Sequence, residues 1–204
     1  MAANLVKAGH AVHGFDPVPA AVEIAQSNGI KVFTTAVEAV VGAQVVITML
    51  PSGPIVKSLY EDILPVATSG ALFIDSSTIS VDDARRINAQ AVDRGFAQVD
   101  APVSGGVKGA VAGTLAFMVG GSDEAFSAAR STLDPMAGKI IHCGDTGAGQ
   151  AAKVCNNMVL AVQQIAVGEA FKLAEKLGLS DQALYDVITG ATGNCWAVQT
   201  NCPV

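Results

Sequence analysis

The stretch Gly147-Ala-Gly-Gln-Ala-Ala-Lys-Val-Cys-Asn-Asn157 divides this sequence into two parts with different patterns. Before it, short apolar segments alternate with amphipathic ones, which predicts strands alternating with helices. After it, apolar residues recur at helical spacing as far as Leu177, and Gly178 follows as a helix stop. We therefore expect an α/β domain over residues 1–146. Residues 147–204 are expected to form a long helix and the beginning of an all-α domain.

The first part predicts a doubly wound, largely parallel sheet with helices on both faces. The expected strands cover residues 11–15, 44–50, 71–75, 97–103, 114–119 and 139–143. The expected helices cover residues 1–8, 20–28, 54–60, 80–94 and a segment from 123, followed in the second part by 150–177 and 180–188. Thr35-Ala-Val-Glu38 has the spacing of a capping box, and Ser80 is a candidate N-cap.

Composition limits the classes of function that the chain can have. Half of the 204 residues are hydrophobic and 15% are charged, enough apolar content for a sizeable core. The net charge of −6 gives no basic footprint for nucleic acid, and no apolar run reaches the roughly 18 residues of a membrane span. The four cysteines lack CxxC spacing. We expect no metal site, and reduced thiols in a compartment such as the cytosol.

A glycine turn follows the strand expected at residues 97–103. The segment reads Asp100-Ala-Pro-Val-Ser-Gly-Gly106. Glycine lets the backbone approach a ligand closely, and successive N–H groups beside a hydroxyl suit an anion such as a carboxylate. We therefore predict that Ser104, Gly105 and Gly106 bind substrate. A generic glycine turn is the alternative interpretation.

Lys153 lies near the start of the long helix expected after Gly149. Asn157, four residues later, lies on the same helix face. A buried lysine has a lowered pKa, which suits proton transfer near neutral pH. We expect burial here because the helix carries many apolar side chains, namely Val154, Met158, Val159, Leu160, Ile165 and Val167. A lysine that extends along the helix to solvent is the alternative. With the glycine turn, Lys153 indicates an enzyme for a small hydroxy acid.

Three segments are candidates for cofactor contacts. Asp16 follows the first expected strand, where a dinucleotide-binding fold places a carboxylate that binds the ribose hydroxyls. An ordinary aspartate in a turn before proline is the alternative interpretation. Met49, Leu50 and Pro51 end a strand and either line a cofactor cleft or only stop that strand. The hydroxyls of Asp75-Ser-Ser-Thr78 either contact a cofactor or serve as turn and cap groups.

These motifs together resemble the β-hydroxyacid dehydrogenase family over nearly all of the chain. The segment Asp100–Gly106 is similar to the family's substrate motif, and Gly147–Asn157 to its catalytic motif. Residues Met1–His10 resemble the helix that follows the family's glycine loop. Near the C-terminus, Asn194–Trp196 and Cys202–Val204 resemble the hydroxyisobutyrate branch.

The resemblance implies a Rossmann-like sheet, NAD as cofactor and a defined set of roles. Lys153 would be the catalytic residue that transfers the hydroxyl proton, and Asn157 would orient the substrate oxygen or the lysine. The turn at residues 104–106 would hold the substrate carboxylate. Contacts to NAD are implied for Leu50, Pro51 and Thr78.

The implied reaction is oxidation of 3-hydroxyisobutyrate to methylmalonate semialdehyde, as in valine breakdown. Tartronate semialdehyde reductase is the enzymatic alternative, and a noncatalytic structural domain is the alternative from another class. The resemblance also implies a small-molecule substrate, a homo-oligomer in the full-length form, and no nucleic-acid or membrane partner. The location would be the cytosol, or the mitochondrial matrix for an organellar member.

The family's first strand, with its Gly-x-Gly-x-x-Gly loop, would fall before Met1, and most of its helical domain after Val204. The loop supplies N–H groups for the pyrophosphate, and the strand belongs in the middle of the sheet. From the chain as given we therefore expect two unpaired strand edges and weak or no activity.

Overall fold

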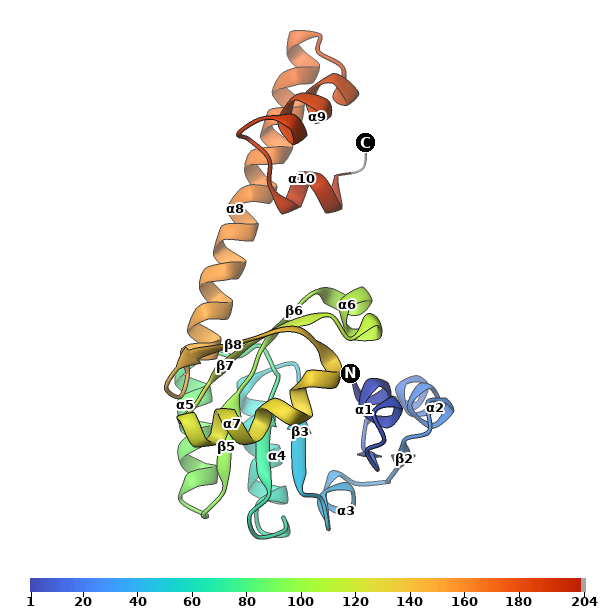
Figure 1. Ribbon diagram of the computed structural model, residues 1–204, viewed down its shortest axis with the longest axis vertical. Coiled ribbons are helices and arrows are strands. Elements are labelled where there is room, and N and C mark those ends of the chain that lie inside the picture. Colours follow the sequence, from blue (N-terminus) through green and yellow to red (C-terminus); the bar gives the residue numbers. More distant parts are fainter. Residues whose placement is uncertain (203–204) are drawn as a thin grey trace. The chain divides into compact units, whose positions relative to one another are not determined.

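The computed structural model describes residues 1–202. Its contacts separate into two compact units, Met1–Lys153 and Val154–Val204, and each unit is described by itself (Figure 1). Helix α8 (Ala148–Leu177) begins in the first unit and continues into the second. The predicted domain boundary near residue 147 stays a prediction, since this division follows contacts within the chain and does not test which part binds the cofactor.

The first unit alternates short helices and strands along the chain. Its helices before α8 are α1 (Ala2–Lys7), α2 (Pro19–Ser27), α3 (Ala36–Val40), α4 (Gly53–Ile63), α5 (Val81–Val92), α6 (Gly106–Ala112), α7 (Asp123–Leu133) and the 3-10 turn η1 (Asp134–Met136). Its strands are β1 (His13–Gly14), β2 (Lys31–Val32), β3 (Val45–Thr48), β4 (Leu72–Asp75), β5 (Ala97–Asp100), β6 (Val103–Ser104), β7 (Leu115–Gly120) and β8 (Ala137–Gly144).

The main sheet has the order β3-β4-β5-β7-β6, with β8 also paired to β7. Strands β3, β4 and β5 are parallel and in register, so that Thr48, Asp75 and Asp100 lie side by side at their carboxyl ends. The predicted doubly wound, largely parallel sheet is confirmed, and β7 and β8 are also parallel. Strands β1 and β2 form a separate parallel pair. Among the described residues, β1 and β3 each therefore keep one unpaired edge.

One feature of the sheet differs from the expectation. The strand predicted over residues 97–103 is split into β5 and β6, and both are antiparallel to β7. The split falls at Ala101 and Pro102, because proline has no N–H to donate to a neighbouring strand. The chain then reverses through α6, so β7 runs back along the same line. A glycine turn and a short helix therefore project from this edge of the sheet.

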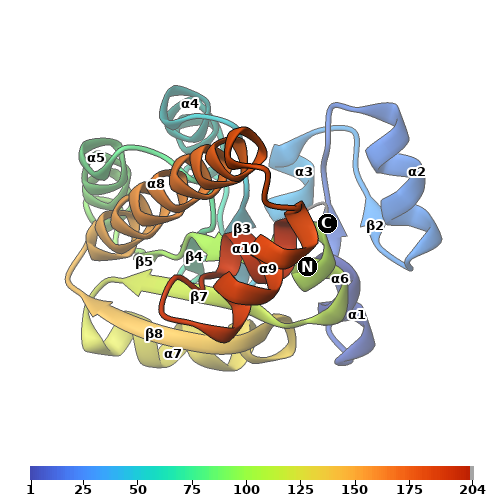
Figure 2. The same cartoon turned by 90° about the horizontal axis from the view of Figure 1, so that it is seen from above.

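Apolar side chains cover both faces of the sheet. Figure 2 shows α4 and α5 on one face and α7 on the other. The strand β4 supplies both sides alternately, since Phe73 packs with the α4 and α5 cluster while Leu72 and Ile74 pack with α7. Helix starts follow local signals, and the predicted capping box at Thr35 and the cap at Ser80 are both present. The sheet, packed on both faces, therefore supports the loops at its carboxyl edge.

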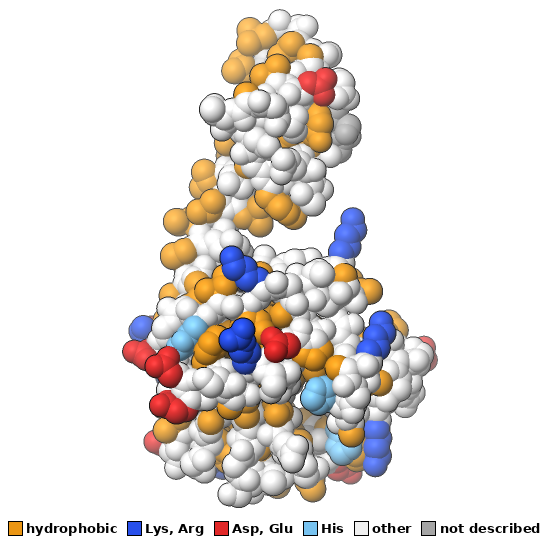
Figure 3. Space-filling model, viewed as in Figure 1, with side chains coloured by type: hydrophobic (Ala, Val, Ile, Leu, Met, Phe, Trp, Pro, Cys, Tyr) orange, Lys and Arg blue, Asp and Glu red, His pale blue; other side chains and the backbone are white. Residues whose placement is uncertain are grey.

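The second unit contains the remainder of α8 together with α9 (Asp181–Gly190) and α10 (Trp196–Asn201). The expected burial of the apolar side chains on α8 is wrong for most of them, because α9 and α10 leave much of its surface uncovered. Four of the six predicted residues are at least half exposed, namely Val154, Met158, Val159 and Ile165. Figure 3 shows hydrophobic side chains exposed on this unit. Trp196 at the start of α10 is also 51% exposed.

Candidate active site

The loops that carry the predicted site residues leave the carboxyl ends of β3, β4 and β5. Because these strands are parallel and in register, their ends meet at one edge of the sheet. Met49 follows β3, Thr78 follows β4, and the segment leading to Ser104 follows β5. In Figure 1, α6 and the first turn of α8 also lie at this end of the first unit.

The Ser-Gly-Gly turn has the backbone geometry that the sequence predicts. Gly105 and Gly106 have φ angles of 133° and 61°, which favour glycine over residues with a side chain. A Cβ on Gly105 would also lie 3.1 Å from Leu115 Cδ2. Both glycines are exposed and Ser104 is half-buried. The turn thus presents a hydroxyl and the first backbone N–H groups of α6 where a carboxylate can reach them.

Lys153 lies in the second turn of α8 and is half-buried. Burial lowers the pKa of its ammonium below the ordinary lysine value. Within residues 1–202, no carboxylate lies within 4 Å of its Nζ to counter that effect. A larger share of Lys153 is therefore neutral near physiological pH than for an exposed lysine, which suits proton acceptance.

Asn157 is one helical turn beyond Lys153 and is exposed. It belongs to the second unit, and its Oδ1 lies 3.4 Å from Asn156 Nδ2. The helix places the two predicted catalytic side chains on one face by their spacing of four residues. The assignment of Asn157 to the substrate oxygen stays a prediction.

Two buried aspartates organise the edge beneath these loops. Asp75 Oδ1 accepts hydrogen bonds from Thr48 Oγ1 at 2.8 Å, Ser77 N at 3.1 Å and Ser77 Oγ at 2.6 Å. The Ser77 hydroxyl in turn accepts the N–H of Leu50 at 2.9 Å. Burial raises the pKa of the Asp75 carboxyl. Asp75 therefore links the end of β4 to the segment that carries the predicted cofactor residues.

The second aspartate, Asp100, fixes the start of α8. Its Oδ1 accepts the N–H of Gly147 at 2.7 Å, and its Oδ2 accepts that of Gln150 at 2.9 Å. Burial raises the pKa of this carboxyl as well. The strand that leads to Ser104 and the helix that carries Lys153 are thereby joined at a single side chain.

The predicted cofactor residues lie on the segments after β1, β3 and β4, and their contacts to NAD stay a prediction. Met49 is 59% exposed at the carboxyl end of β3, and the neighbouring Pro51 and Thr78 are also exposed. Two apolar side chains and one hydroxyl are thus accessible at this edge of the sheet. Asp16 is exposed after β1 and borders a cavity of about 190 Å³. Its Oδ1 accepts the N–H of Val18 at 2.8 Å, a contact that orients the carboxylate.

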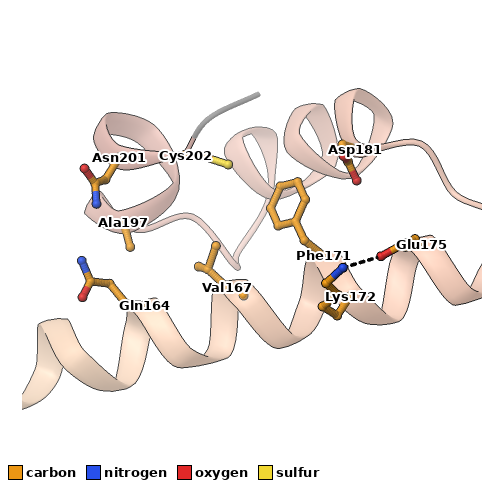
Figure 4. Close-up of a pocket in the computed structure, with 10 residues that line it drawn as sticks. Gln164, Val167, Phe171, Lys172, Glu175, Asp181, Ala197, Asn201 and Cys202 are labelled. Atoms are coloured by element: carbon orange, nitrogen blue, oxygen red, sulfur yellow. Dashed lines mark hydrogen bonds and ion pairs between the residues drawn. The ribbon is translucent and has the colours of Figure 1, made fainter.

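A second cavity, of about 530 Å³, lies within the second unit between α8, α9 and α10 (Figure 4). It contains none of the predicted site residues. Lys172 on its wall is exposed and bound to Glu175 at 2.8 Å. This ion pair and its exposure keep the lysine charged, since the pKa of Lys172 is raised by its hydrogen bond to Glu175. We therefore do not assign the reaction to this cavity.

Sequence reasoning missed the roles of three buried polar residues. From sequence, Asp75 and Asp100 are only the first residues of two motifs, and Gln150 is only one residue of the segment 147–157. A usable signal was present for the aspartates, since each is the last residue of a strand and a buried charge in that place needs partners. Among the residues that the structure describes, no cluster of histidine, cysteine, aspartate or glutamate is placed to hold a metal ion. No helix in the same range is long and apolar enough to cross a bilayer.

Two family models cover nearly the whole chain. Residues 1–144 match the NAD binding domain of 6-phosphogluconate dehydrogenase, and residues 147–204 match the NAD-binding domain of NADP-dependent 3-hydroxyisobutyrate dehydrogenase. A probable 3-hydroxyisobutyrate dehydrogenase of Mycobacterium tuberculosis is 68% identical over 204 residues, which are 100% of this chain and 69% of the relative. The chain belongs to the β-hydroxyacid dehydrogenase family. The predicted family and its NAD cofactor are thus confirmed.

Other members of the β-hydroxyacid dehydrogenase family broaden the comparison. An NAD-dependent L-serine dehydrogenase of Pseudomonas aeruginosa is 45% identical, covering 100% of this chain and 69% of the relative. The solved structure of the Mycobacterium tuberculosis 3-hydroxyisobutyrate dehydrogenase with L-serine has a TM-score of 0.94 and 67% identity. It covers 100% of this chain and 70% of that one. These matches confirm the Rossmann-like fold followed by a helical region, and they show an oxidoreductase by family.

Proposed function

We propose that this β-hydroxyacid dehydrogenase oxidises 3-hydroxyisobutyrate to methylmalonate semialdehyde with NAD, the step known from valine breakdown. The family models and the 68% identical relative support this substrate class. The observation that carries the chemistry is the half-buried Lys153 with its lowered pKa, on a helix whose start is bound to the strand that leads to Ser104.

In the proposed mechanism, the Ser104 hydroxyl and the N–H groups of Gly105 and Gly106 bind the substrate carboxylate. The neutral amine of Lys153 then accepts the proton of the substrate hydroxyl as the C–H bond at the same carbon breaks. Asn157 orients that oxygen or the lysine. NAD, when bound along the residues after β1, β3 and β4, supplies the chemistry of hydride acceptance. Loss of the proton to Lys153, which becomes an ammonium, leaves the product carbonyl oxygen uncharged once the hydride has been lost.

Replacing Lys153 with alanine tests the proposal in enzyme expressed from its complete coding sequence. A general base contributes about 10²–10⁴-fold to the rate, so we expect kcat to fall by that factor. Lys153→Arg should fall similarly, because a guanidinium does not deprotonate in proteins. Lys176→Ala is the control, since this lysine is exposed on the same helix and has no proposed role. Unchanged turnover in Lys153→Ala would refute the assignment.

A second candidate substrate is L-serine. The relative named as an L-serine dehydrogenase and the solved structure with L-serine favour it. L-serine also carries a carboxylate and a hydroxymethyl group on one carbon, so the same turn and lysine address both molecules. The ratio of kcat/KM for the two acids decides between them, and tartronate semialdehyde belongs in the same panel. Absence of turnover with every acid would favour a noncatalytic role.

We also propose a homo-oligomer and a reducing compartment. The exposed apolar side chains of α8 support association, because apolar surface of this kind is usually buried against protein. Cys143, Cys155, Cys195 and Cys202 are free thiols, as expected in the cytosol or a mitochondrial matrix. Light scattering on the purified enzyme tests the first proposal, and a single monomeric mass would contradict it.

A further inference from the structure

The carboxylate of Asp100 occupies a site built closely around it. Asp100 is completely buried at the end of β5, and both of its oxygens accept backbone N–H groups, from Gly147 and Gln150. These two donors lie in and just before the first turn of α8, about fifty residues along the chain. An aspartate at a helix start stabilises the free N–H groups and the positive end of the helix dipole.

Two glycines make room for this contact. A Cβ on Gly120 would lie 2.5 Å from Asp100 Oδ1 and 2.7 Å from Gly149 N. A Cβ on Gly149 would overlap the carbonyl oxygen of Met118 and lie 2.6 Å from that of Asp100. The first turn of α8 is therefore in direct backbone contact with β5 and β7, and neither position has room for a side chain.

Gln150 provides a second attachment for the same helical turn. Its side chain is buried, with 1% of its surface exposed. Its Nε2 donates to the carbonyl oxygen of Ser77 at 2.7 Å, and its Oε1 accepts the N–H of Ile79 at 3.2 Å. The start of α8 is therefore fixed to the loop after β4 as well as to the end of β5.

We propose that Asp100, with Gln150, is a positioning residue that holds the Lys153 amine at the distance from the Ser104–Gly106 turn that one small hydroxy acid spans. Ser104 lies four residues after Asp100 on a short path through Pro102. Lys153 lies one helical turn after Gln150. The Ser104–Gly106 turn, which would bind the substrate carboxylate, and the Lys153 amine, which would accept the proton, are thus both held in place by the Asp100 carboxylate. This inference rests on the proposed catalytic role of Lys153.

Asp100→Asn is the direct test, measured on enzyme expressed from its complete coding sequence. The carboxamide keeps one acceptor and turns an NH₂ group toward the N–H that the other oxygen had bound. A misplacement of about 1 Å costs roughly 100-fold in rate, so we expect kcat to fall about 100-fold. The KM for NAD should change far less than kcat, because Asp100 bonds the start of α8 and not the cofactor residues after β1, β3 and β4.

A double-mutant cycle separates positioning from a general loss of structure. If Asp100 acts through Lys153, Asp100→Asn should change the residual rate of Lys153→Ala by no more than about twofold, the limit of additivity errors. The same 100-fold factor in both backgrounds would overturn the proposal, as would an unchanged kcat in Asp100→Asn alone. Full activity in Lys153→Ala alone would instead reject the proposed catalytic role, which keeps the two failures distinct.

Two further variants complete the experiment. Thr35→Ala removes the capping hydrogen bond to Glu38 N at the start of α3, and so matches the loss of a helix-start contact away from the site. It should lower stability while leaving kcat within about twofold of the parent, as independent sites do.

Gln150→Ala keeps the buried charge satisfied, and it carries the test if Asp100→Asn fails to fold. Gln150→Ala should lower kcat when Lys153 is present, and it should change the residual rate of Lys153→Ala by no more than about twofold. A kcat equal to the parent's would overturn the proposal.

Discussion

The substitution of glycine by alanine should have different effects on stability at two positions of α8, Gly149 and Gly168. At Gly149 the new methyl would overlap the carbonyl oxygen of Met118 and lie 2.6 Å from that of Asp100. Because Cβ atoms essentially never approach within 3.0 Å of other heavy atoms, the Asp100 contact alone requires a shift of 0.4 Å, from 2.6 to 3.0 Å, and the overlap with Met118 requires a larger one. At Gly168 a Cβ would meet nothing within 4 Å. The two substitutions should therefore have opposite effects on stability.

Overpacking of this kind costs about 1–3 kcal/mol, so Gly149→Ala should lower the free energy of unfolding by that amount. Gly168→Ala should raise it by about 0.5–1 kcal/mol, because alanine loses less backbone entropy than glycine in a helix. Each kcal/mol corresponds to about 2–4 °C in Tm for a chain of this size. Thermal unfolding followed by circular dichroism measures both variants, with turnover recorded in parallel. Equal Tm values for Gly149→Ala and the parent would refute the close contact at Asp100.

Three other predictions concern the site itself. Burial lowers the pKa of Lys153 in the folded state, so the unfolded chain binds more protons at pH values between the folded-state pKa and the ordinary lysine pKa. The free energy of unfolding should therefore rise with pH across this interval, and Lys153→Met should lose that rise in urea titrations at several pH values. Ser104→Ala should raise the KM for the hydroxy acid about tenfold without changing the KM for NAD, because one hydrogen bond to a charged group is worth about 1.5 kcal/mol. An unchanged KM for the hydroxy acid in steady-state assays would argue against carboxylate binding at this turn. Asp16→Ala should reduce discrimination against NADP, because its carboxylate repels a 2′-phosphate, and an unchanged ratio of kcat/KM for NAD and NADP would place the adenosine elsewhere.

Local sequence signals predicted most elements of the first unit. Thr35 and Ser80 cap their helices as expected, and Gly178 directly follows the end of α8. These features depend on residues within one or two turns of each other, so a short stretch of sequence contains all the needed information. The alternation of strands and helices similarly indicated the parallel sheet and its two covered faces.

Features that depend on distant partners were not predictable in the same way. Asp100 reaches Gly147 and Gln150 across about fifty residues, and no local pattern encodes that pairing. The exposure of Met158 and Ile165 also escaped prediction, because periodicity shows that a helix face is apolar but not whether another segment covers it. For the candidate site, the glycine turn and Lys153 were predicted from residue type and family resemblance, whereas the contacts that hold them required the fold.

A crystal structure of the complete enzyme with NAD and 3-hydroxyisobutyrate is the most direct measurement of the central claim. The account predicts the substrate carboxylate on the N–H groups and hydroxyl at residues 104–106. It also predicts the substrate hydroxyl oxygen about 2.6–3.2 Å from Lys153 Nζ. A substrate bound away from either group, or a Lys153 amine directed away from the glycine turn, would contradict it.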